Sequence, residues 1–523
     1  MKRFATLSQV MLLLWGDAAL AHDENLPTEL HFQRQASQRL IFDREQALPL
    51  ASLDPTKIVD LELMHPVRTS GGGKAEVKQG NLILRGPTSF KSSIWLSGFN
   101  PFATYRIELS TVGDGQLGLE FRQHQGSSLR IEMVTTPGRI DGVHWSLRND
   151  QDQVQSEGTA RDFQARPVEG PVTFLVQMTA IGFNLYCEQQ GTLEWLGRAD
   201  IVAHLDVRKK EVFRNMSTWI HAEGSRESSY TILGASAELS PGIGQADIRT
   251  ITDEEGTPLM DEGRLWFTAT TRGGGLPHPA QGVFSLSPGL FDFRFEGLIA
   301  FDRGDGLLRN DLASHLFFDR KNQEWRGWTT AFSAFGDPQK KEPKEILAVR
   351  SLHDPRHGFS TMQAAPIGLV GDYEDPQGVF DSSSGTWRML LCQNAGGYKA
   401  AVFESDHWDG GFHRIAGPVA SDSTGTTLQT LDGTRYAFFG SADQSFHVCT
   451  FPELQPLGKL DLDLPPWRAK GPSRVWPCIV PLPEGYPAPY LLLTFDRANF
   501  PGMPLPNWTY GALHLYHGHF PGK

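Results

Sequence analysis

The chain has 523 residues, of which 39 % are hydrophobic and 21 % charged, with 54 Gly, 34 Pro, 32 Phe and 13 Trp. Frequent Gly and Pro beside many aromatic residues are typical of short strands joined by tight turns, and they argue against a disordered chain or a helical bundle. The 48 basic and 60 acidic side chains give a net charge of −12. A negative protein repels polyphosphates, so nucleic acid is not an expected partner.

The first 21 residues have the pattern of a cleavable signal peptide. Lys2 and Arg3 precede an apolar run from Phe4 to Trp15, and the small-residue triplet Ala19-Leu20-Ala21 marks the cleavage site. No stretch approaches the 18 apolar residues of a membrane span. The sequence therefore predicts a secreted or periplasmic protein without a membrane span.

Four cysteines follow the predicted signal, at Cys187, Cys392, Cys449 and Cys478. An oxidising compartment allows one or two disulfides, whereas their wide spacing without a CxxC pair disfavours a zinc site. Phosphate-binding and dinucleotide-binding glycine motifs are absent after the expected strands. We expect neither a metal nor a cofactor.

Residues 22–240 read as a β-sandwich. Short alternating segments such as 81–85, 105–110 and 172–178 recur between Gly, Asn and Pro. Alternation with period two, interrupted by turn residues, is typical of antiparallel sheets with one buried face. The pattern resembles concanavalin-like or laminin-G-like jelly rolls.

Residues 241–523 contain a repeat of a strand, a polar turn and an aromatic second strand. Copies begin near Asp247, Leu316, Val379, Leu428 and Ile479, and two further strand-like runs follow each hairpin. Four strands per unit predict a five-bladed β-propeller. The predicted blades span 243–302, 308–358, 368–418, 420–464 and 472–519.

The first strand of each propeller blade lines the central channel, so polar residues at the starts of these strands are candidates for one common site. They are Asp247, Arg309, Asp311, Glu374, Asp375, Asp422, Arg474 and Trp476. Converging carboxylates raise the pKa of at least one of them and can divide into an acid and a base. The alternative is that the aspartates only cap strands and turns.

Loops after the second strands contribute further candidates on the same face. Arg272 and His278 lie in one such loop and Arg497 in another. Arg272, Arg474 and Arg497 suit an acidic or sulfated sugar, because guanidinium binds carboxylate and sulfate with two hydrogen bonds. Alternatively, these arginines pair only with neighbouring blades.

The repeat, the segment Ala246-Asp247-Ile248, the segment 374–381 and the segment 402–412 resemble the five-bladed glycoside hydrolases of families 43, 32 and 117. That resemblance implies hydrolysis of a glycosidic bond by two carboxylates. It assigns Asp247 as the general base and Asp375 as the residue that tunes the acid. The family's blade-four glutamate has no counterpart, which leaves Asp422, Glu374 or His278 as substitutes.

We therefore expect a glycoside hydrolase that acts on a carbohydrate substrate, with exo action and without a cofactor. One alternative is a polysaccharide lyase that uses a Tyr or His base on a uronic-acid glycan. Another is a non-catalytic glycan-binding propeller, an alternative that the missing blade-four glutamate supports.

Overall fold

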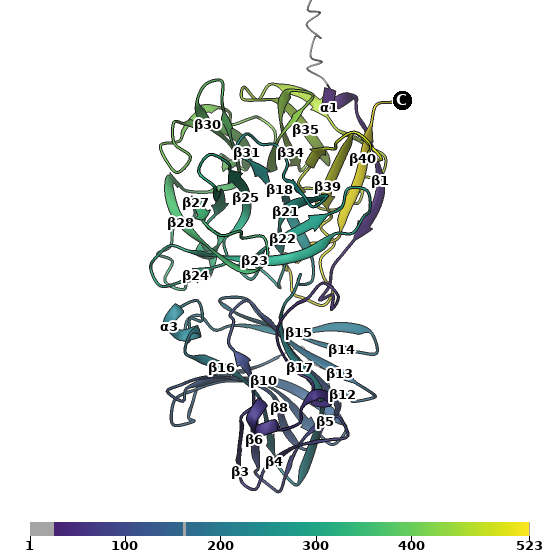
Figure 1. Cartoon of the computed structure of the whole chain (residues 1–523), viewed down its shortest axis with the longest axis vertical. Coiled ribbons are helices and arrows are strands. Elements are labelled where there is room, and N and C mark those ends of the chain that lie inside the picture. The colour runs from purple at the N-terminus through teal and green to yellow at the C-terminus, as the bar shows by residue number, and fades with distance from the viewer. Residues whose placement is uncertain (1–25, 161–163, 522–523) are drawn as a thin grey trace, which may run out of the picture.

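The structure is a computed structural model that describes residues 26–160 and 164–521. The predicted signal peptide, residues 1–21, lies outside the described residues. The all-β prediction is confirmed, since strands dominate both bodies that Figure 1 shows one above the other. The helical turns are α1 (Leu26–Glu29), η1 (Pro55–Lys57), α2 (Leu61–Met64), α3 (Lys210–Phe213) and η2 (Phe332–Gly336). No helix in the described part of the chain has the length and apolar character needed to cross a bilayer.

The lower body in Figure 1 is a β-sandwich of two sheets with eight strands each. Alternate residues such as Leu119 and Phe121 on one sheet share a core with Tyr105 and Ile107 on the other, as period-two alternation predicts. The first sheet contains β11 (Val154–Thr159), β10 (Arg139–Arg148), β9 (Ser128–Thr136), β8 (Gly115–Gln123), β16 (Met216–Gly224), β6 (Lys91–Gly98), β3 (Val67–Ser70) and β12 (Arg166–Pro167). The second contains β15 (Thr192–Asp200), β14 (Gly182–Gln189), β13 (Val172–Met178), β7 (Thr104–Thr111), β17 (Ser228–Leu239), β5 (Asn81–Gly86), β4 (Lys74–Lys78) and β2 (Leu48–Leu53).

The upper body consists of antiparallel meanders of four strands. The first two are β18 (Gln245–Thr250), β21 (Arg264–Thr271), β22 (Ala280–Leu286), β23 (Arg294–Asp302), and β25 (Leu312–Asp319), β26 (Glu324–Thr330), β27 (Glu345–Ser351), β28 (Gly358–Val370). Because β23 and β28 pair in parallel, these two meanders belong to one 11-stranded sheet. The next two are β29 (Tyr373–Asp381), β30 (Thr386–Asn394), β31 (Tyr398–Ser405), β32 (His413–Ala416), and β33 (Thr424–Leu431), β34 (Thr434–Ser441), β35 (Ser445–Thr450), β36 (Pro456–Lys459). The last contains β38 (Cys478–Pro481), β39 (Tyr490–Phe495), β40 (Leu513–His519) and β1 (His31–Gln38). Short strands accompany these meanders: β19 (Thr252–Asp253), β20 (Met260–Asp261), β24 (Leu308–Arg309) and β37 (Asp461–Leu462).

The first strands of these meanders contact one another in cyclic order. β18 lies against β25, β25 against β29, β29 against β33, β33 against β38, and β38 against β18. Their starts therefore surround a common axis, although they come from segments far apart in the sequence.

The five meanders thus form a ring, and the N-terminal strand β1 belongs to this ring of meanders and not to the sandwich. It pairs antiparallel with β40 from His31 opposite His519 to Gln38 opposite Leu513, and Figure 1 shows purple β1 beside yellow β40. Its Phe32 is fully buried. The predicted start of the sandwich at residue 22 is therefore wrong, because an alternating strand does not reveal which sheet edge it will join.

Two further expectations are corrected. The second blade is predicted to end at residue 358, but its fourth strand, β28, begins there and runs to Val370. This strand contains Pro366 and Gly368, residues that ordinarily mark turns. All four cysteines are free and buried. They lie on β14, β30, β35 and β38, so the possible disulfides do not form.

Candidate functional site

A cavity of about 270 Å³ lies where the first strands of the ring begin. Residues from each of the five meanders line it. The sequence-predicted residues in its wall are Asp247, Arg272, Glu374, Asp375, Arg474, Trp476 and Arg497. The ring thus brings together side chains that are up to 250 positions apart in the chain.

A shared backbone feature places the two aspartates. Asp247, Ala313, Asp375 and Gly425 each sit at a register shift in the first strand of a meander, with φ between 55° and 61°. A residue with left-handed backbone conformation in a bulge points its side chain out of the regular alternation between the two faces of the sheet. Only the first and third meanders carry a carboxylate at this position.

Asp247 is ion-paired in the cavity wall. Its carboxylate accepts a hydrogen bond from the guanidinium of Arg272, and the two side chains are only 12 % and 7 % exposed. Arg272 also stacks on the ring of Tyr510, with its guanidinium carbon 4.7 Å from the centroid. The cavity wall therefore contains an ion pair that is largely shielded from water.

Asp375 has the opposite electrostatic environment. One of its oxygens accepts from the backbone N–H of Gly425 at 2.8 Å and approaches the thiol of Cys392 at 3.6 Å. Burial, together with the negative charges of Glu374 and Asp247, raises the pKa of Asp375 to about 7. The cavity therefore combines an aspartate that is ion-paired with Arg272 and an aspartate whose pKa is raised.

Glu374 belongs to a cluster with Lys344, Tyr398 and Asp372. Its carboxylate accepts from the Lys344 ammonium and from the Tyr398 hydroxyl, the latter at 2.7 Å. The same ammonium and hydroxyl also bind Asp372. Burial and these carboxylates raise the pKa of Tyr398. The carboxylate of Glu374 is therefore engaged by a cation and a hydroxyl within this cluster.

Asp422 does not line the cavity. It accepts two hydrogen bonds from Arg474, both at 2.9 Å, and so fixes the guanidinium that does line it. Trp476 is 3 % exposed, and the Arg249 guanidinium carbon lies 4.7 Å from the centroid of its ring. Trp476 therefore lines the cavity but offers little free ring surface.

Asp311 and His278 also lie outside the cavity lining. Asp311 is fully buried, where it binds Arg303 and the backbone N–H of Ser333. His278 contacts the sandwich, with ring nitrogens 2.7 Å from the Thr179 hydroxyl and 2.9 Å from Asp200. Since Arg272 and Leu276 of the same loop line the cavity, the sandwich supports part of its wall.

Several residues of the wall were not candidates from the sequence. They are Leu276, Ala313, Phe332, Phe335, Tyr398, Thr424, Trp508 and Tyr510. Phe332 and Phe335 belong to η2, and Trp508 and Tyr510 to the loop between β39 and β40. An aromatic cluster in a long loop after a second strand was the available signal for the latter pair. Tyr398 begins a third strand, where the repeat gives no signal.

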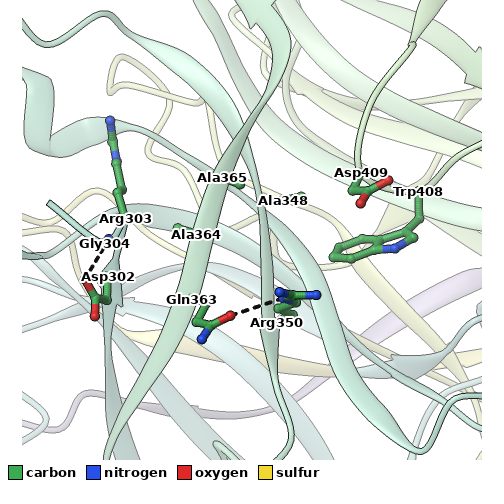
Figure 2. Close-up of a pocket in the computed structure, with 10 residues that line it drawn as sticks. All are labelled: Asp302, Arg303, Gly304, Ala348, Arg350, Gln363, Ala364, Ala365, Trp408 and Asp409. Atoms are coloured by element: carbon green, nitrogen blue, oxygen red, sulfur yellow. Dashed lines mark hydrogen bonds between the residues drawn. The ribbon is translucent and has the colours of Figure 1, made fainter.

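A separate cavity of about 380 Å³ lies on the outer strands of the second meander (Figure 2). Ala348, Ala364 and Ala365 line it together with Trp408. Its polar groups are engaged locally, since Arg350 donates to Gln363 at 3.2 Å and Asp302 accepts from the Gly304 N–H at 2.9 Å. It contains none of the sequence-predicted site residues.

In the described residues, no group of three or more His, Cys, Asp or Glu side chains has the arrangement to hold a metal ion. The sequence matches no protein-family model, and no curated protein matches it.

Solved structures show partial likeness. The Emp46p carbohydrate recognition domain in its potassium-bound form is 13 % identical, with 38 % of this chain and 99 % of that chain covered and a TM-score of 0.26. A legume lectin-like domain from Entamoeba histolytica is 9 % identical, with 33 % and 88 % covered and a TM-score of 0.25. A BT0996 RGII complex is 10 % identical, with 52 % and 89 % covered and a TM-score of 0.35. The resemblance to glycoside hydrolases remains a prediction from the sequence.

Proposed function

We propose that the meanders form a five-bladed β-propeller and that its central cavity binds a carbohydrate. The cyclic contacts of the first strands support the propeller, because the first strands of propeller blades surround a common axis. The cavity lies at the starts of these strands, where the loops of a propeller converge.

The observation that carries this proposal is the composition of the cavity wall. Phe332, Phe335 and Trp508 supply aromatic surface, and Phe335 is 50 % exposed. Arginines and carboxylates stand beside these rings. Sugars present both C–H faces and hydroxyl groups, so a site with rings and hydrogen-bonding groups matches them. The volume of about 270 Å³ is near the lower end of small-ligand sites and favours one terminal sugar residue.

Binding is tested with an array of neutral and acidic oligosaccharides, followed by calorimetry on the best ligand. Asp247→Asn keeps a residue type that tolerates the left-handed conformation and removes the charge. Because Asp247 itself lines the cavity and would accept hydrogen bonds from sugar hydroxyls, we expect this variant to bind at least about tenfold more weakly. Asp409→Asn, at the separate exposed cavity, is the matched control. Absence of any glycan ligand for the wild-type protein overturns the proposal.

Hydrolysis of a glycosidic bond is a second candidate activity. The contrast between Asp247, ion-paired with Arg272, and Asp375, with a pKa of about 7, favours it. In this scheme Asp375 gives its proton to the glycosidic oxygen as the bond to the anomeric carbon breaks. Water attacks that carbon and loses its proton to Asp247.

Release of reducing ends distinguishes hydrolysis from binding alone. Loss of this release in both Asp247→Asn and Asp375→Asn, with the fold retained, supports the scheme. If the wild-type protein binds a glycan but releases no reducing ends from it, the protein is a non-catalytic glycan-binding protein. Unsaturated, ultraviolet-absorbing products would indicate a polysaccharide lyase instead. A lyase needs a base such as tyrosine, and burial raises the pKa of Tyr510 to about 12, which makes Tyr510 a poor candidate for that base.

A further inference from the structure

We infer that the ligand is an acidic oligosaccharide and that Arg497 binds a carboxylate or sulfate group where two cavities meet. This inference rests on the proposed carbohydrate-binding function and specifies the chemical class of the glycan. The sequence alone offers three equivalent arginines for such a role, and the structure distinguishes among them.

Two of these arginines already have carboxylate partners. Arg272 is paired with Asp247, and Arg474 with Asp422. Arg497 instead donates to the Tyr510 hydroxyl, and its guanidinium carbon lies 4.3 Å from the centroid of that ring and 5.6 Å from that of Trp508. Within residues 26–160 and 164–521, no carboxylate is ion-paired with Arg497. Stacked rings hold this guanidinium in place and leave its charge available to a ligand.

Arg497 also lines a second cavity, of about 510 Å³, that adjoins the first. The wall of this adjoining cavity includes Trp467, Arg468 and Lys470, and its one carboxylate, Asp496, contacts the His514 ring at 3.2 Å. Arg468 and Lys470 are exposed, and neither has an ion-paired carboxylate among the described residues. The half-buried ring of Trp467 stands beside them. The basic surface therefore continues from Arg497 into a space that accommodates a further sugar residue.

This arrangement predicts how the ligand lies. A terminal sugar occupies the central cavity, and its acidic group reaches Arg497, which is suited to two parallel hydrogen bonds. The next sugar lies in the adjoining cavity, where Arg468 and Lys470 attract its acidic group. Because these two side chains are exposed, salt screens their contribution more than that of Arg497.

The test measures affinity for paired probes by calorimetry. The probes are galacturonate, glucuronate and galactose 6-sulfate, their disaccharides, and the neutral sugar of the same length for each. We expect at least one acidic probe to bind about tenfold or more tightly than its neutral counterpart. Arg497→Met should bring that ratio close to one, whereas Arg497→Lys, which keeps the charge, should retain part of it.

The double variant Arg468→Gln/Lys470→Gln should weaken acidic disaccharides and spare acidic monosaccharides. Thermal unfolding of each variant checks that the fold is retained. Equal binding of neutral and acidic probes by the wild-type protein overturns this inference and leaves the proposed function intact. Binding of none of these probes overturns this inference, and the oligosaccharide array decides separately whether the proposed function also fails. Equal losses for mono- and disaccharides in the double variant overturn the second subsite.

Discussion

The backbone N–H of Gly425 donates to a carboxylate oxygen of Asp375 at 2.8 Å, and both residues have φ of 61°. They occupy equivalent positions in the bulges of β29 and β33, the first strands of neighbouring meanders. The bulge in β29 turns the Asp375 side chain out of the regular alternation. The equivalent bulge in β33 supplies the N–H that donates to it. Asp375 is buried by this arrangement, and burial raises its pKa.

The ionisation of Asp375 should make stability depend on pH. Its pKa in the folded chain is about 7, above the ordinary value of 3.8. A raised pKa gives stability that is fully present below the unfolded value and is lost as pH rises through about 7. Asp375→Asn removes this pH-dependent contribution to stability. Urea unfolding should therefore show the variant gaining on the wild type by about 1.4 kcal/mol per pH unit from pH 5 to about pH 7, with no further gain up to pH 8. A constant difference across that range would contradict the raised pKa.

Gly425→Ala should damage the site through both conformation and packing. An added Cβ would overlap the Trp476 ring, and the residue has φ of 61°. We expect a loss of about 2–5 kcal/mol in the free energy of unfolding. Gly263→Ala is the matched control, because Gly263 has φ of 74° and no atom within 4 Å of an added Cβ. It should lose only the conformational part, about 1–2 kcal/mol.

Asp422→Asn should increase affinity for acidic sugars. Asp422 neutralises Arg474, which is 46 % exposed and lines the central cavity. Removal of the carboxylate leaves that guanidinium available to the ligand. Since exposed ion pairs contribute less than about 1 kcal/mol, we expect a gain of about two- to fivefold that declines with added salt. Calorimetry with Asp409→Asn as the charge-matched control checks this, and a loss of affinity would contradict it.

His278→Ala should loosen the contact between sandwich and ring. The His278 side chain is fully buried, and its loss leaves the Thr179 hydroxyl without this partner. We expect a loss of about 1–3 kcal/mol in stability, faster hydrogen exchange in residues 272–278 and weaker ligand binding. His204→Ala, at an exposed histidine of the sandwich, should change none of these. Unchanged exchange in the loop would show that the sandwich does not support the cavity wall.

Phe32→Ala should destabilise the ring through its N-terminal strand. Phe32 is fully buried on β1, opposite Gly518 of β40. Chemical unfolding should show a loss of about 3–5 kcal/mol. Gln33→Ala, at an exposed position of the same strand, should stay within about 0.5 kcal/mol of the wild type. A small effect of Phe32→Ala would show that β1 contributes little to closing the ring.

Local patterns in the sequence were enough to predict the strands, the sandwich and the repeat, because alternation and turn residues act over a few neighbouring positions. Register within the repeat also placed Asp247, Asp375 and Arg474 at the starts of their strands, and all three line one cavity. Tertiary structure decided the rest. The pairing of β1 with β40 joins opposite ends of the chain. The electrostatic environment of each candidate depends on partners such as Gly425, Lys344 and Asp422 from other segments. Burial and ion pairing are properties of the assembled ring, so the sequence could name the titratable groups but not their protonation or their availability to a ligand.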